Sequence, residues 1–180
     1  MPSKSSIFRP CLPALAIAGV FVTGVSSLVQ AQSMPGITVF SGIDRENQLS
    51  YYLDYGGIPS RPDRYHLKVP PRKMELAVSE FAVSYPESFT GTFDVDDVRV
   101  EVDGETVDID EVVWDEENRL IRIYLTEPAP AASNVELVFS NMRNPRSSGM
   151  HYFNCLVVSP GDSTALLRYI GTWIISIGGV

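Results

Sequence analysis

Cysteine is scarce in this sequence, with two residues among 180. Two cysteines are too few for a disulfide scaffold or for a cysteine-rich zinc site. Cys11 lies in the first thirty residues, and Cys155 lies in an apolar run over 150–158. No basic residue near Cys155 would lower the pKa of its thiol. We therefore interpret Cys155 as a small buried residue rather than as a reactive thiol.

Basic residues are also few: 14 Lys and Arg face 22 Asp and Glu, and the formal net charge is −8. Binding to nucleic acid needs clustered basic side chains against the phosphates, so we expect no nucleic-acid partner. The apolar fraction of 44% and the charged fraction of 20% are typical of a globular chain and exclude a disordered or collagen-like one.

Motifs of the common catalytic sites are missing as well. The sequence has no Gly-x-Ser-x-Gly, no glycine-rich phosphate loop and no Cys-x-x-Cys. Gly161-Asp162-Ser163 superficially resembles a hydrolase nucleophile, but it follows Pro160 and no histidine lies downstream. We interpret it as a turn. We therefore expect no enzyme and no catalytic residues.

The first 31 residues have the pattern of a secretory signal peptide. Lys4 and Arg9 precede an apolar run over 11–29, and Val29-Gln30-Ala31 supplies small residues at a cleavage position. The alternative is an uncleaved anchor helix, because the apolar run could just span a bilayer. We expect cleavage after Ala31, a mature chain without a transmembrane helix, and a periplasmic or extracellular location.

Alternating apolar and polar residues recur along the rest of the chain, and this period of two is typical of strands. It is found at 65–69, 74–85, 98–102, 107–109, 112–114, 121–125, 135–139, 150–158 and 169–177. Turn signals separate these short runs, which predicts an all-β fold: an antiparallel immunoglobulin-like β-sandwich, with a barrel as the alternative.

Local features refine this prediction. A change of phase near Ser79 predicts a β-bulge, and Asp103-Gly104 predicts a tight turn. Trp114 and Trp173 each lie on the apolar face of a predicted strand and should be buried. Tyr169 should lie on the same face as Trp173. Residues 41–64 are the least regular part of the chain. We therefore divide it into a signal peptide over 1–31, an irregular N-terminal arm over 32–60 and the sandwich over 61–178.

Several short motifs follow one another in a characteristic order. They are HLKVP at 66–70, FDVDD at 93–97, VWD at 113–115 with IRI at 121–123, EPAP at 127–130, and MRNPR at 142–146 with Gly149. This order resembles a family of cyanobacterial exported proteins that is grouped as a domain of unknown function, and the similarity covers about residues 60–178. The resemblance implies an exported all-β domain and no particular activity.

Charge is concentrated in one segment, residues 94–117, which contains twelve acids and one basic residue, Arg99. Asp94, Asp96 and Asp97 offer three carboxylates within four residues, and calcium binds several oxygen ligands. They are therefore our candidate metal ligands. The segment is not an EF-hand, because placing Gly104 at the sixth position would put Arg99 at the first. The alternative is that the acids are solvated and protect exposed strand edges from aggregation.

The remaining candidates each have a structural alternative. We interpret His66 and His151 as strand residues rather than zinc ligands, since neither has the neighbours that zinc needs. Arg146 could recognise a carboxylate or sulfate, or brace its own loop, which we favour. The tyrosines at 51, 52 and 55 could stack on sugars, or pin a loop to the domain.

Together these observations predict an exported, non-enzymatic protein of the cell envelope that binds a protein or a glycan. No cofactor is expected. The alternative is a calcium-dependent ligand-binding domain that uses the acidic segment 94–117.

Overall fold

The computed structural model describes residues 42–162 and 166–179. The predicted signal peptide over 1–31, including Cys11 and the cleavage position at Ala31, lies outside the described residues, as does most of the predicted arm. Within the described part, no helix is long and apolar enough to cross a membrane.

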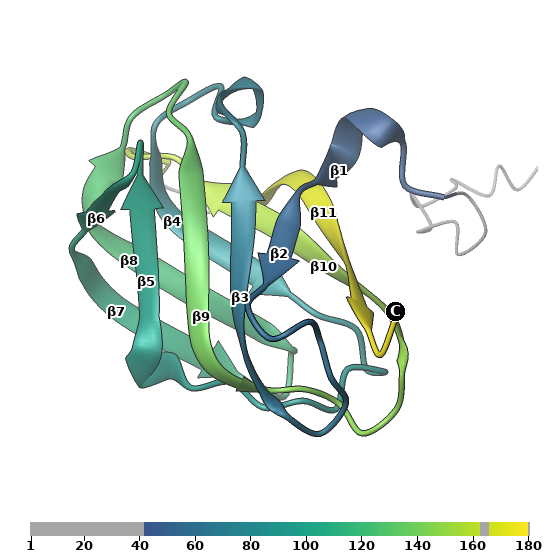
Figure 1. Cartoon of the computed structure of the whole chain (residues 1–180). Helices are drawn as coiled ribbons and strands as arrows, with labels where there is room; N and C mark the ends of the chain where they lie inside the picture. The colour runs from purple at the N-terminus through teal and green to yellow at the C-terminus, as the bar shows by residue number, and fades with distance from the viewer. Residues whose placement is uncertain (1–41, 163–165, 180) are drawn as a thin grey trace, which may run out of the picture. The chain divides into compact units, whose positions relative to one another are not determined.

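In the described residues, eleven strands form two facing sheets (Figure 1). The six-stranded sheet has the order β1 (Gln48–Leu49), β11 (Arg168–Ile177), β10 (Gly149–Val158), β4 (Val78–Ser84), β8 (Leu120–Ala129), β7 (Ile109–Asp115). The five-stranded sheet has the order β2 (Tyr51–Leu53), β3 (Pro62–Val69), β9 (Val135–Arg143), β5 (Val98–Val102), β6 (Glu105–Val107). Three single-turn 3₁₀ helices, Arg45–Asn47, Pro71–Lys73 and Val95–Asp97, complete the described elements.

Strand pairing is antiparallel throughout these sheets, except that β1 runs parallel to β11. The predicted antiparallel immunoglobulin-like sandwich is therefore confirmed. The two sheets remain separate, so the chain does not form the alternative barrel.

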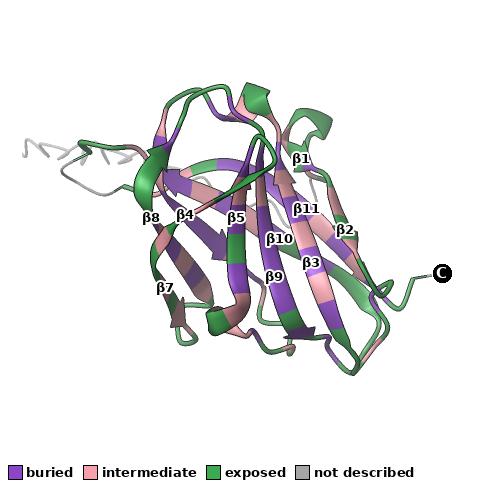
Figure 2. Cartoon of the chain, turned by 60° about the vertical axis from the view of Figure 1, so that its left-hand side comes forward, coloured by how far each residue is buried: buried purple, intermediate pink, exposed green. Residues whose placement is uncertain are grey.

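The core lies between the sheets and follows the alternation in the sequence. Along β3, the side chains of Tyr65, Leu67 and Val69 are buried, and the residues between them face outwards (Figure 2). Trp173 is fully buried, as predicted, and its indole N–H donates a hydrogen bond of 3.0 Å to the carbonyl of Lys68 in the opposite sheet. Trp114 is only half-buried, with its indole N–H donating to the Tyr85 hydroxyl at 2.8 Å.

Register shifts change the alternation of sides along β4 and β11. The pairing of β4 with β8 shifts between Val78 and Glu80, which confirms the bulge predicted near Ser79. A second shift lies between β10 and β11, where Cys155 pairs with Gly171 but Leu156 pairs with Tyr169. This bulge turns Tyr169 to the outer face, so its predicted place beside Trp173 is wrong.

The tight turn predicted at Asp103-Gly104 is confirmed. It joins β5 to β6, with φ of 53° at Asp103 and 88° at Gly104. Positive φ at both central residues is the geometry of a type I′ hairpin turn, and Asp-Gly suits it because glycine has no Cβ to clash.

Residues 48–53 belong to the sandwich and not to an irregular arm. Leu49 pairs with Trp173 in the six-stranded sheet, and Tyr51 pairs with Leu67 in the five-stranded sheet. The sandwich therefore begins before the predicted boundary at residue 61. Strands of two and three residues are too short to show an alternation in the sequence, which explains the difference.

Candidate functional site

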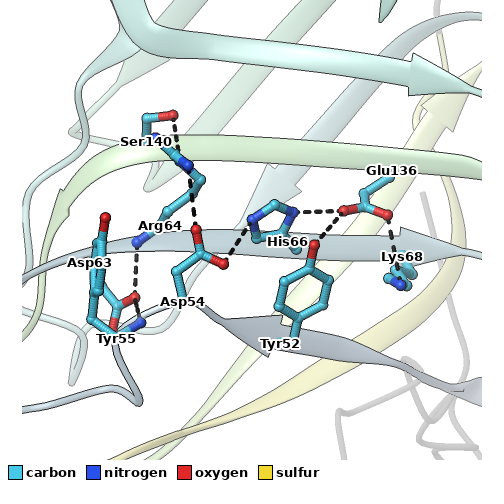
Figure 3. A network of polar contacts seen from close by, with 9 residues as sticks. All are labelled: Tyr52, Asp54, Tyr55, Asp63, Arg64, His66, Lys68, Glu136 and Ser140. Atoms are coloured by element: carbon cyan, nitrogen blue, oxygen red, sulfur yellow. Dashed lines mark hydrogen bonds and ion pairs between the residues drawn. The ribbon is translucent and has the colours of Figure 1, made fainter. Parts of the chain in front are cut away.

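The outer face of the five-stranded sheet carries a row of charged side chains from β3, β9 and the loop after β2 (Figure 3). His66 lies at its centre, with Nδ1 2.6 Å from Oε1 of Glu136 and Nε2 3.2 Å from Oδ1 of Asp54. Arg64 contacts Oδ2 of Asp54 at 3.3 Å, and the ammonium of Lys68 lies 3.7 Å from Oε2 of Glu136.

Tyr52 covers this row. Its ring stacks on the His66 imidazole with the centroids 4.0 Å apart and an angle of 11° between the planes, and its hydroxyl donates to Glu136 at 3.3 Å. The Lys68 ammonium lies 4.9 Å from the centre of the same ring. The charges of this row are thus matched to one another, and they join β2, β3 and β9.

The outer face of the six-stranded sheet is different in kind. Phe153, Cys155 and Val157 of β10 point into the core, so the residues between them face outwards. We call the resulting surface the tyrosine face, and its residues are Ser84, Tyr124, Tyr152, Asn154, Leu156, Tyr169, Thr172 and Ile174. None of these side chains carries a charge at neutral pH.

Two tyrosine rings stand out from the tyrosine face. Tyr152 is 42% exposed and Tyr169 is 43% exposed. Strand register places Tyr152 opposite Ile174, and Tyr169 opposite Leu156. Each exposed ring therefore stands beside a half-buried aliphatic side chain of the neighbouring strand.

A chain of neutral hydrogen bonds lies between the two rings. The Tyr169 hydroxyl lies 2.7 Å from the hydroxyl of Thr172, which donates to Oδ1 of Asn154 at 2.8 Å. The Asn154 amide in turn donates to the Ser84 hydroxyl at 3.2 Å. Thr172 is fully buried, so its hydroxyl anchors the Tyr169 hydroxyl and the half-buried Asn154 amide from within the sheet.

One ion pair borders the tyrosine face. Arg122 donates two hydrogen bonds to Glu80, at 2.6 and 3.0 Å, and its guanidinium carbon lies 5.4 Å from the centre of the Tyr124 ring. These bonds to Glu80 raise the pKa of Arg122. The two charges neutralise each other, so the pair adds no net charge to this surface.

The predicted metal ligands do not form a three-carboxylate site. Asp94 and Asp97 both accept from the Asn141 amide, at 3.5 and 2.9 Å, and Asp94 also accepts from the backbone N–H of Asp96 at 3.3 Å. The side chain of Asp96 is exposed. In residues 42–162 and 166–179, no three His, Cys, Asp or Glu side chains are grouped to hold a metal ion. The calcium site stays a prediction without support from this geometry.

The other predicted residues have structural roles or are exposed. Cys155 is fully buried, and burial raises the pKa of its thiol, as expected of an inert residue. His151 is buried with its ring edge-on to Phe89, 5.3 Å between centroids, and burial lowers its pKa. Tyr51 pins the end of β11, since its hydroxyl accepts from the Ser176 N–H at 2.8 Å. Tyr55 is exposed.

The loop that contains Arg146 is braced by a different residue. Arg146 is exposed, whereas Asn144 is buried, accepts from the Tyr65 hydroxyl and donates to the carbonyl of Ile58 at 2.9 Å. The Asn144 amide also lies 3.3 Å from Oδ2 of Asp63. The predicted brace exists, but Asn144 supplies it in place of Arg146.

A hollow of about 340 Å³ lies beside β6 and the end of β8, lined by residues that include Val102, Val107, Thr126 and Pro128. Most of the residues that line it are exposed. It is an open hollow, and it lacks the enclosed apolar walls with converging polar groups that are typical of small-molecule sites.

The two facing antiparallel sheets place the chain among the immunoglobulin-like β-sandwiches. Residues 37–177 match the family model described as a protein of unknown function, DUF2808, and the chain belongs to this family. The predicted membership of a domain-of-unknown-function family is thereby confirmed. Cyanobacterial origin and export stay predictions.

Solved structures with similar folds come from several kinds of protein. The bacterial hydrophobin BslA is 13% identical with a TM-score of 0.44, covering 72% of this chain and 96% of its own. The collagen-binding domain of a Staphylococcus aureus adhesin is 6% identical with a TM-score of 0.42, covering 72% and 95%. An uncharacterised Nocardia farcinica protein with an immunoglobulin-like fold is 8% identical with a TM-score of 0.41, covering 73% and 99%. No curated protein matches the sequence.

Proposed function

We propose that the chain is an exported, non-enzymatic binding module of the cell envelope, and that the tyrosine face binds its partner. The observation that carries this proposal is the contrast between the two outer faces. The charged side chains over β2, β3 and β9 are engaged with one another, whereas Tyr152 and Tyr169 present exposed rings among side chains without charge. Exposed aromatic residues with few charges among them are typical of the centre of a binding interface.

The polar clusters of the described residues favour binding over catalysis. One serine–histidine contact exists, with the Ser88 hydroxyl 3.5 Å from Nδ1 of His151. Within the described ranges, Nε2 of His151 has no hydrogen-bond partner. A catalytic triad needs an acid that orients the imidazole through its second nitrogen, so this pair lacks the arrangement of a general base.

Export is supported by the sequence of residues 1–31, and fractionation of the cells tests it. We expect a product that lacks these residues and is found outside the cytoplasm. A full-length product in the cytoplasm would refute this part of the proposal.

The binding test uses the mature protein and its own envelope fraction. Retention of the protein on this fraction should fall about thirtyfold in a Tyr152→Ser, Tyr169→Ser double variant, the loss expected when a hot-spot aromatic is removed. Tyr52→Ser is the matched control, because Tyr52 is 43% exposed but lies on the opposite sheet. Equal retention of all three proteins would refute a role for the tyrosine face.

A further inference from the structure

We infer that the partner of the tyrosine face is an uncharged glycan. This inference rests on the proposed function and narrows the partner to one chemical class. Three properties of the face support it: the spacing of its exposed rings, the neutral hydrogen-bonding groups between them, and the mutual pairing of the Arg122 and Glu80 charges at its border.

Spacing is the first argument. Tyr152 and Leu156 lie on the same face of β10, four residues apart, and Tyr169 stands opposite Leu156 on β11. Because a strand rises about 3.4 Å per residue, the two rings are separated by roughly 14 Å along the sheet. That span suits an extended oligosaccharide. The C–H groups of a sugar ring can pack on each tyrosine, whose ring face carries partial negative charge.

Hydrogen-bonding capacity is the second argument. Between the rings lie the half-buried Asn154 amide and the Tyr169 hydroxyl, and the fully buried Thr172 hydroxyl holds them by contacts of 2.8 and 2.7 Å. Hydroxyl and amide groups both donate and accept hydrogen bonds, as sugar hydroxyls do. Their fixed positions limit the conformational entropy that binding would cost.

Charge is the third argument. The chain has a formal net charge of −8, so an anionic polymer would be repelled. Bidentate pairing with Glu80 occupies Arg122, the basic residue that borders the face. Glu80 is buried in this same pair, and the exposed Glu111 stands opposite Tyr124 on β7, with β8 and β4 between β7 and the strands that carry Tyr152 and Tyr169. Electrostatic complementarity therefore favours a partner without charge.

The experiment separates a glycan from a protein on the same envelope fraction. One sample is digested with a general protease and washed, and a second is oxidised with periodate, which cleaves the vicinal diols of sugars. The mature protein is then bound to each sample and to an untreated one. We expect retention to survive the protease and to fall at least about tenfold after periodate.

Conservative variants test the kind of contact. In Tyr152→Phe, the ring remains and only its hydroxyl is lost, so we expect retention close to that of the wild type. Tyr152→Ser removes the ring and should bind weakly. Retention of the Phe variant as low as that of the Ser variant would contradict ring packing on sugar. Melting temperatures of both variants show whether the fold is intact.

The outcomes distinguish the inference from the proposed function. Retention that depends on Tyr152 and Tyr169 but disappears with the protease would identify a protein partner, which overturns the glycan and leaves the binding module. Retention that is unchanged when both tyrosines are replaced would overturn the glycan partner and the binding role of the tyrosine face. The protein can also be bound to alginate, a charged polysaccharide. If alginate retained it as well as the envelope fraction does, the inference of an uncharged partner would be overturned.

Discussion

Replacing Asp63 by alanine should destabilise the fold more than any other change to a carboxylate of this chain. Asp63 is 1% exposed and accepts four hydrogen bonds. Its Oδ1 accepts from the N–H groups of Tyr55 and Arg64 at 2.9 and 2.8 Å, and its Oδ2 accepts from the Gly57 N–H at 2.8 Å and the Asn144 amide at 3.3 Å. One side chain thus anchors the loop between β2 and β3.

The magnitude follows from the donors that would be left without an acceptor. The hydrogen bonds from Gly57 and Asn144 are both buried. A buried donor without a partner costs about 1–3 kcal/mol, so Asp63→Ala should lower the free energy of unfolding by about 2–5 kcal/mol. Asp63→Asn should also destabilise, because both carboxylate oxygens face donors and the new amide would turn one NH₂ group towards them.

Urea denaturation of the mature protein, followed by tryptophan fluorescence, measures this loss. Asp115→Ala is the control, since Asp115 accepts hydrogen bonds from Asn118 in an exposed turn and its loss should move the midpoint only slightly. The slope with urea should stay constant across the variants, which separates a change in stability from a change in the denatured state. An Asp63→Ala protein that unfolds at the wild-type midpoint would refute the reasoning.

Three further measurements test the core, the acidic segment and the response to pH. Trp173→Ala should cost about 3–5 kcal/mol of unfolding free energy, and Trp114→Ala clearly less, because only Trp173 is fully buried; equal losses would contradict this packing. The melting temperature should be the same in chelator, in calcium and in magnesium at fixed ionic strength. If calcium alone raised it, and an Asp94→Asn, Asp96→Asn variant lost this effect, the calcium site would be established. Burial lowers the pKa of His151, so on acidification this imidazole is protonated at a higher pH in the unfolded chain than in the folded one. The free energy of unfolding should therefore fall as the pH drops below about 6.5, the ordinary pKa of histidine. His151→Phe should flatten this fall, and an unchanged slope in the variant would contradict the reasoning.

Alternation and turn chemistry made most strands predictable. The period-two pattern at 65–69 ends at Pro70-Pro71, where the structure has a single turn of 3₁₀ helix. The phase change near Ser79 corresponds to a register shift, since Val78 pairs with Ala129 but Glu80 pairs with Tyr124. The two strands advance by numbers of residues that differ by an odd number, so the alternation of sides changes phase there. Leu76 shows the limit of the pattern, since it alternates with Val78 but lies before β4 and is exposed.

The candidate site was harder to predict because it depends on strand register. Tyr124, Tyr152 and Tyr169 lie on three different strands, and only pairing through β4 and β10 brings those strands into one sheet. Tyr169 was expected inside, and a bulge at its neighbour Ile170 turns it outwards. The burial of Asp63 was equally hidden, because three of its four donors are backbone N–H groups, which leave no trace in residue type.

The pairing of β1 with β11 has a consequence for how the protein reaches its folded state. Leu49, near the start of the described chain, lies beside Trp173, near its end. Strand β11 lies between the edge strand β1 and β10, so this edge of the sheet is incomplete without it. A chain that emerges from its N-terminus cannot bury Trp173 or close this edge until the last strand has appeared. Pairs between strands so far apart in sequence form slowly, so this edge of the six-stranded sheet closes only after residues 168–177 have been synthesised.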